Sequence, residues 1–152
     1  MDDRMHKYSA HLASLSGVSC SVLDISLKCL DTGHFCTQCP MGCDFLNMHL
    51  YGCYEAHRWG GKYIYYCPAG FIFVAATAVN DMDMPQFGVL AGPVIMGNLE
   101  DFDAPFPAGD MVNLSTKKVN DLAEIMGVLV PALSEKGGFG IEKQQNTLLN
   151  DL

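Results

Sequence analysis

The sequence predicts an α+β domain built on a single antiparallel sheet with flanking helices. Three observations predict it: helix-type apolar spacing near both ends of the chain, several short β-rich segments between them, and turn residues that separate these segments closely enough for hairpins. At 152 residues the chain fits one domain with a single hydrophobic core. We expect this domain to span residues 1–136 and a polar connector or tail to span 137–152.

The first element is expected to be an amphipathic helix over residues 5–15 that ends at Gly17, because apolar side chains recur there at spacings of three and four. These side chains are Met5, Tyr8, Leu12 and Leu15. The β-branched and apolar residues 18–25 then predict a strand, and a second short strand follows over 27–30.

An irregular, cysteine-rich loop follows over residues 34–43, and a helix is expected over 44–58 because this stretch lacks proline and is followed by Gly60-Gly61. Three β-type segments come next, over residues 63–67, 71–79 and 87–96. The acidic turn between the last two predicts a hairpin.

The final element is expected to be a helix over residues 116–134, capped by Ser115 or Thr116. Its apolar residues again repeat every three or four positions, and Pro131 predicts a kink or an early end. The repeat comprises Val119, Leu122, Met126, Leu129 and Leu133. Since Ile125 and Val130 add part of a second apolar face, we expect this helix to support dimerisation or signal transfer, and a homodimer stays open.

Composition excludes some classes of function. Hydrophobic residues make up 49% of the chain and charged residues 17%, which is typical of an ordered globular domain. The formal net charge of -8 would repel phosphate backbones, so we expect no direct nucleic-acid binding by this segment. The N-terminal residues lack the apolar region of a signal peptide, and the longest apolar run, 71–79, is too short to span a bilayer. We therefore expect a cytoplasmic protein without a membrane partner.

Cysteines provide the sharpest chemical signal. In the reducing cytosol, seven cysteines indicate metal ligands, reactive thiols or small core residues rather than disulfides. Three of them lie within eight residues of the polar loop, and a fourth follows the aromatic strand; the predicted metal site comprises Cys36, Cys39, Cys43 and Cys67. Four thiolates suit tetrahedral zinc, with an iron–sulfur cluster as the less favoured cofactor. Cys53, flanked by His49 and His57 on the predicted helix, is a competing candidate, and packing of these cysteines in the core is the structural alternative.

Catalysis has no positive support in the sequence. It contains no GxSxG, HExxH, GxGxxG or P-loop motif, and its carboxylates concentrate in the termini and in loops. The histidines form no recognisable catalytic set, because a Cys–His nucleophile pair depends on geometry rather than on spacing. We therefore expect that the chain is not an enzyme.

Aromatic residues crowd the predicted helix–strand unit that precedes Cys67. Strand alternation predicts that Tyr63, Tyr65 and Cys67 share one face, opposite Ile64 and Tyr66. Aromatic walls with hydroxyl groups suit a small, uncharged, partly apolar ligand, and only Arg58 and Lys62 carry charge nearby. We expect such a ligand to contact Trp59, Tyr65, Tyr66, Phe71 and Gly92. The alternative is that the tyrosines face water and the strand glycines serve close packing of the sheet.

Three motifs resemble the PocR-type sensory domain. They are Cys43 ahead of the predicted helix, Cys67-Pro68-Ala69-Gly70-Phe71 after a strand, and Gly88-Val89-Leu90-Ala91-Gly92-Pro93 in the last long strand. The resemblance covers about residues 8–135. It implies a PAS/GAF-like fold that senses small hydrocarbon derivatives, usually ahead of an AraC-type DNA-binding domain or a signalling output. We expect no helix-turn-helix domain within these 152 residues, and Cys53 lies outside the pattern.

The function expected from these observations is small-molecule sensing for a bacterial signal-transduction or transcription regulator, with a short diol or polyol as the ligand. The alternative is a metal- or redox-responsive regulatory module that uses the cysteine cluster itself. A thiol enzyme is the third and weakest hypothesis.

Overall fold

The computed structural model describes residues 2–31, 33–106 and 111–134. Two helices lie at the ends of this part of the chain and one in its middle. In chain order the elements are α1 (Asp2–Ser16), β1 (Cys20–Asp24), β2 (Cys29–Leu30), the 3-10 helix η1 (Phe35–Gln38), α2 (Phe45–Arg58), β3 (Lys62–Tyr66), β4 (Ile72–Val79), β5 (Pro85–Met96), the 3-10 helix η2 (Leu99–Asp101), β6 (Val112–Leu114) and α3 (Thr116–Ala132). Among the helices of these residues, none combines the length and the apolar character that crossing a membrane requires.

The strands form one sheet in the order β2-β1-β5-β4-β3, and all neighbours in this order are antiparallel. The expected α+β class and the β4–β5 hairpin are therefore confirmed. The sequence did not predict β6, which pairs with β5 in parallel through Val94 and Val112. This short strand is defined by a partner far away in the chain, so its own three residues carry little local signal.

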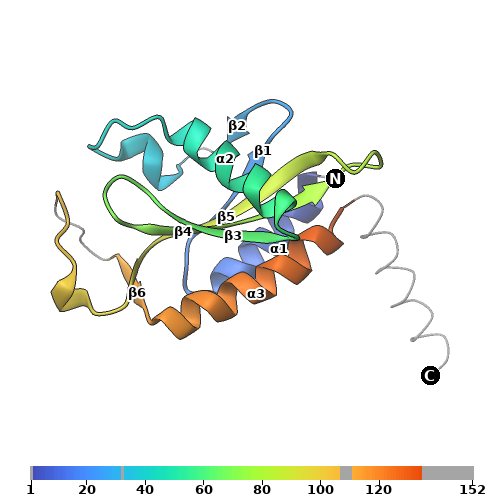
Figure 1. The fold of residues 1–152 in the computed structure, drawn as a ribbon. Helices are drawn as coiled ribbons and strands as arrows, with labels where there is room; N and C mark the ends of the chain where they lie inside the picture. Colours follow the sequence, from blue (N-terminus) through green and yellow to red (C-terminus); the bar gives the residue numbers. More distant parts are fainter. Residues whose placement is uncertain (1, 32, 107–110, 135–152) are drawn as a thin grey trace, which may run out of the picture.

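The sheet separates two layers of helices, with α2 on one face and α1 and α3 side by side on the other (Figure 1). Side chains along β4 alternate between the two faces of the sheet and pack in both apolar layers. Ile72, Val74 and Ala76 point toward α1 and α3, whereas Phe73 and Ala75 point toward α2. Alternation along β3 also follows the prediction: Tyr63 and Tyr65 lie on the α2 face and Ile64 on the opposite face.

Helix boundaries follow from local hydrogen bonds. The Asp44 side chain caps α2 by accepting a bond from the Asn47 N–H, and Ser115, rather than Thr116, caps α3 by accepting a bond from the Lys118 N–H. Gly17, with φ of +74°, ends α1 in the left-handed conformation that glycine adopts most readily. Helix α3 ends at Ala132, directly after Pro131, which agrees with the expected early end.

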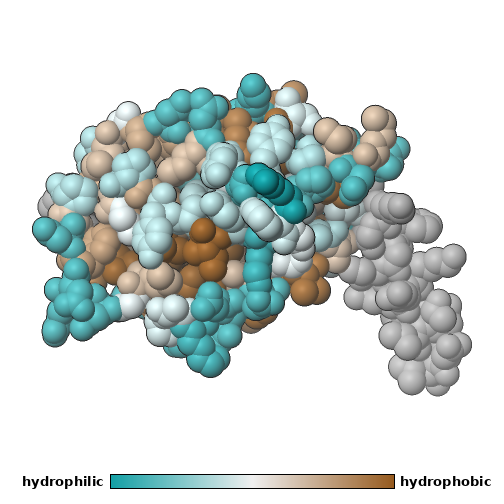
Figure 2. All heavy atoms as spheres, in the orientation of Figure 1, coloured by the Kyte–Doolittle hydropathy of each residue, from teal (hydrophilic) through white to brown (hydrophobic). Residues whose placement is uncertain are grey.

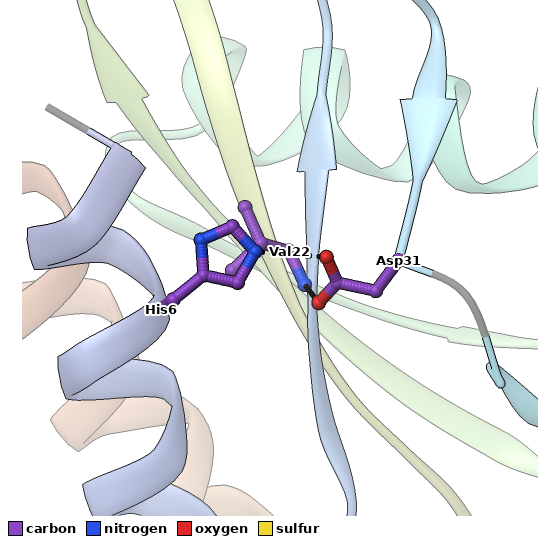
Figure 3. A network of polar contacts seen from close by, with 3 residues as sticks. All are labelled: His6, Val22 and Asp31. Carbon is purple, nitrogen blue, oxygen red and sulfur yellow. Dashed lines mark hydrogen bonds and ion pairs between the residues drawn. The ribbon is translucent and has the colours of Figure 1, made fainter.

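Asp31 ties the first strands to α1 (Figure 3). One carboxylate oxygen accepts a hydrogen bond from the Val22 N–H at 2.7 Å, and the other lies 2.9 Å from His6 Nε2. The carboxylate thus joins the end of β2, the middle of β1 and the first turns of α1.

Two expectations about side chains need correction, and a third, about the C-terminal tail, lies outside the described residues. Leu15 was expected in the buried stripe of the first helix, but it is 89% exposed. Val130 was expected on a second, outward face, but it is buried in the core, and the outward apolar residues of α3 are Ile125 and Val128. Figure 2 shows the resulting surface as a mixture of polar and apolar residues. The expected tail, 137–152, lies outside the described residues.

Candidate metal centre between the sheet and α2

A buried polar group interrupts the apolar layer between the sheet and α2. His34 and Cys36 come from the start of η1, His49 from the second turn of α2, and Tyr65 from β3. All four side chains are buried, with His49 fully so. The layer around them is apolar, with Leu50, Phe73 and Leu90 among its members.

Two histidines and one cysteine meet at ligand distance. One ligand atom from each of His34, Cys36 and His49 lies within 4.8 Å of the other two. The Cys36 Sγ lies 3.3 Å from His49 Nε2. On the other side of the same ring, His49 Nδ1 lies 2.7 Å from the Tyr65 hydroxyl. This group of residues could hold a metal ion, because thiolate sulfur and imidazole nitrogen are the ligands that zinc prefers.

The Tyr65 hydroxyl is already placed to accept a hydrogen bond from the His49 ring while that ring binds such an ion. A ligating histidine usually donates its other ring N–H to an oxygen acceptor, which orients the ring. If Nε2 of His49 binds a metal, Nδ1 carries the proton and can donate to the Tyr65 oxygen at its present distance. Phe73 packs edge-on against the His49 ring, with the centroids 4.7 Å apart, and so limits its rotation.

His34 carries the one polar atom in this centre that lacks a partner. Its Nδ1 accepts a hydrogen bond from the Cys36 N–H at 3.1 Å, so in the neutral ring the proton sits on Nε2. Within the described residues, this buried Nε2 has no hydrogen-bond partner. An unpaired buried donor costs about 1–3 kcal/mol, and a bound group that pairs with this ring would remove the cost. Metal ligation through either nitrogen would break the bond from the Cys36 N–H: at Nδ1 the metal takes its place, and at Nε2 the ring proton moves to Nδ1, which can then no longer accept that bond.

Burial keeps both imidazoles neutral, which is the form that binds metals. Desolvation lowers the pKa of His49 to about 3, and the charge that His34 would carry when protonated adds to this effect. Desolvation also lowers the pKa of His34, although the Asp31 carboxylate opposes this effect. Burial and then the neighbouring thiolates of Cys43, Cys39 and Cys67 raise the pKa of Cys36 to about 12. Without a cation, Cys36 is therefore a protonated thiol.

The four predicted cysteine ligands occupy the same region but do not form one group at ligand distance. Cys36 belongs to the group of three, and Cys39, Cys43 and Cys67 are half-buried around it, near enough for their charges to affect its pKa. Cys67 packs against the same apolar layer. Cys53 is fully buried and lies against Gly88, so it packs as a small core residue.

Sequence reasoning missed His34 altogether and considered His49 only beside Cys53. The spacing His34-x-Cys36 offered a local signal, since two ligand types lie two residues apart at the start of the loop. His49 offered none, because its approach to Cys36 depends on how α2 packs on the sheet.

The structure brings one of the five predicted ligand-contacting residues, Tyr65, to this centre. Phe71 is fully buried in a separate small cluster with Ala69 and Ile95. Tyr66 and Trp59 are 63% and 66% exposed, and the Trp59 Nε1–H donates to Glu55 at 2.7 Å.

The fifth residue, Gly92, is where the backbones of β4 and β5 approach each other closely. Its φ is +134°, and a Cβ there would lie 2.7 Å from the carbonyl oxygen of Ile72. Glycine is required at this position because any side chain would collide with the neighbouring strand. The close approach noted in the sequence is therefore to another backbone.

A comparison of the chain with protein-family models, curated proteins and solved structures found no match. Functional inference therefore depends on the geometry of the buried centre.

Proposed function

We propose that the chain is a regulatory sensory module whose sensing element is a metal centre, with zinc as the ion. The observation that carries the proposal is the convergence of His34, Cys36 and His49 within 4.8 Å inside an otherwise apolar layer. Two imidazoles and one thiolate favour zinc over an iron–sulfur cluster, which depends mainly on thiolates. The PocR-type motifs support a sensory role ahead of a DNA-binding or signalling domain.

The same electrostatics argue against a thiol enzyme. A catalytic cysteine needs a lowered pKa, and its base needs a pKa near the working pH. Here burial raises the pKa of Cys36 to about 12 and lowers that of His49 to about 3, so neither thiolate nor imidazolium is favoured. The pair is suited to binding a cation, which would release the thiol proton and supply the missing charge.

Metal binding would link three elements that are far apart in the sequence. His34 and Cys36 would join η1 to α2 through His49, and the bond from His49 to Tyr65 extends the link to β3. The fourth ligand would be a water molecule, because within the described residues no further His, Cys, Asp or Glu joins this group at ligand distance. Because the site forms only in the folded chain, the free energy of metal binding adds to the free energy of unfolding.

The test is metal analysis of protein purified under reducing conditions without chelators. We expect stoichiometric zinc, and in cobalt-substituted protein an absorption band from thiolate-to-cobalt charge transfer. Cys36→Ser and His49→Ala should lose both signals, whereas Cys29→Ser, at an exposed position on β2, should keep them. Parent protein that neither retains zinc nor develops the cobalt band would contradict the proposal.

A second candidate, sensing of a short diol or polyol, is favoured by the unpaired His34 Nε2–H. A ligand hydroxyl can accept this bond, and the Tyr65 hydroxyl offers a second polar contact in the same layer. Thermal-shift titrations of chelator-treated protein with propanediols, glycerol and ethanolamine test it. A ligand present at a hundredfold excess over its Kd would stabilise the fold by about 2.7 kcal/mol. A ligand in this layer should bind less tightly to Tyr65→Phe, and Trp59→Ala, at an exposed position, serves as the control.

We place this module in the cytoplasm. All seven cysteines are free thiols, which fits a reducing compartment and leaves Cys36 available to a metal.

A further inference from the structure

We propose that two copies of this chain associate through the groove between α1 and α3, on the face of the sheet opposite the buried centre. The groove has a volume of about 320 Å³. It is lined by Leu12, Leu15 and Ser16 of α1, Leu114 of β6, and Lys118, Asp121, Leu122 and Ile125 of α3. The two helices that form it lie side by side under the sheet (Figure 1).

Large apolar side chains stand exposed along this groove. Leu15 is 89% exposed and Ile125 57%, and one turn further along α3 Val128 is 73% exposed. Soluble monomers seldom leave such side chains together on one surface, because removing them from water is favourable. These residues therefore indicate an interface.

Two opposite charges on α3 favour a second copy as the partner. On β6 and α3 the groove residues are apolar Leu114, basic Lys118, acidic Asp121, and apolar Leu122 and Ile125. In a two-fold dimer with the two α3 helices antiparallel, Lys118 of each copy meets Asp121 of the other. The two charges lie about one turn apart on the same helix, so a two-fold axis between them brings each charge to its opposite in the other copy, as a two-fold interface requires.

The charges at the groove are available for these contacts. Within the described part of the chain, the Lys118 side chain has no ion-pair partner, and it is exposed. Asp121 is also exposed and pairs with Lys117 at 2.7 Å along the same helix. One of its carboxylate oxygens takes part in that pair, so the carboxylate can still meet a cation from a second copy.

The experiment is sedimentation equilibrium of the full chain across micromolar concentrations, with chelator present so that the result is independent of the proposed metal centre. We expect the parent to dimerise and Ile125→Asp or Leu15→Asp to weaken the dimer at least about tenfold. Both side chains are exposed, so circular dichroism should show that the fold is retained. Leu27→Asp, at a 77% exposed position outside the groove, is the matched control and should dimerise like the parent.

Charge exchange tests the register of the two copies. Lys118→Asp and Asp121→Lys should each weaken the dimer, because each places like charges opposite one another. The double variant exchanges the charges and should restore dimerisation. A parent that remains monomeric at high micromolar concentration, a dimer that tolerates Ile125→Asp, or a double variant no tighter than the single ones would overturn the proposal.

Discussion

Gly88 makes room for the sulfur of Cys53 where α2 packs on β5. A Cβ built at Gly88 would lie 2.2 Å from the Cys53 Sγ, well inside the contact distance of these atoms, but 3.5 Å from the Cys53 Cβ. Gly88 does not have a positive φ, so alanine is permitted by the backbone and only packing opposes it. The substitution Gly88→Ala should therefore destabilise the fold by about 1–3 kcal/mol through overpacking.

Removing the sulfur should reverse most of this cost. Cys53→Ala alone leaves a small cavity and should cost about 1 kcal/mol. In the double variant the new methyl group occupies the space of the missing sulfur, so the total volume is nearly conserved. We expect the double variant to be more stable than Gly88→Ala, with a coupling free energy of about 1–3 kcal/mol.

Urea-induced unfolding, followed by circular dichroism in reducing, chelator-treated buffer, measures the free energy of unfolding of the parent, the two single variants and the double variant. The control pairs Gly88→Ala with Cys20→Ala, a half-buried cysteine on β1 that packs on the other face of the sheet. This pair should be additive within about 0.5 kcal/mol. Additivity of Gly88→Ala and Cys53→Ala would refute the inferred contact.

Three further predictions concern individual side chains. Burial raises the pKa of the Cys53 thiol from 9.0 to about 12, so the unfolded chain loses this proton first as the pH rises. Between pH 9.0 and about pH 12 the free energy of unfolding should therefore fall more steeply in the parent than in Cys53→Ala, by about 1.4 kcal/mol per pH unit. Urea titrations at several alkaline pH values measure this dependence. The same pH dependence in both proteins would contradict the prediction. Asp31→Ala removes the acceptor of the Val22 N–H and should cost about 1–2 kcal/mol, against little change for Asp81→Ala in an exposed turn. Ser115→Ala removes the α3 cap and should cost about 1 kcal/mol in the same urea assay; an unchanged midpoint would show that the cap contributes nothing.

Most of the fold could be predicted from the sequence because the relevant signals are local. Apolar spacing identifies α1 and α3, and alternation assigns Tyr65 and Ile64 to opposite faces of β3. The spacing of apolar residues predicts the face of the helix or strand on which a side chain lies. It does not say whether another element lies opposite, which is why Leu15 shares the spacing of Leu12 but is exposed.

The candidate site could be predicted only in part. The cysteine-rich loop indicated metal chemistry near Cys36, because closely spaced ligand residues are visible in the sequence itself. The partners of Cys36 could not be read in the same way. His49 lies on a different element from Cys36, and the aromatic residues near Tyr65 looked alike although Trp59 and Tyr66 face water.

The sequence by itself determined the class of the fold, the approximate helices and the long strands, and the abundance of soft metal ligands in one loop. Only the tertiary structure decided that His34, Cys36 and His49 meet, that the Tyr65 hydroxyl contacts His49, and that Gly92 serves the approach of two strands. The physical reason is that element type follows from side chains a few residues apart. A site depends instead on the order of strands in the sheet and on the face that each helix covers, and both are set by contacts across the whole domain.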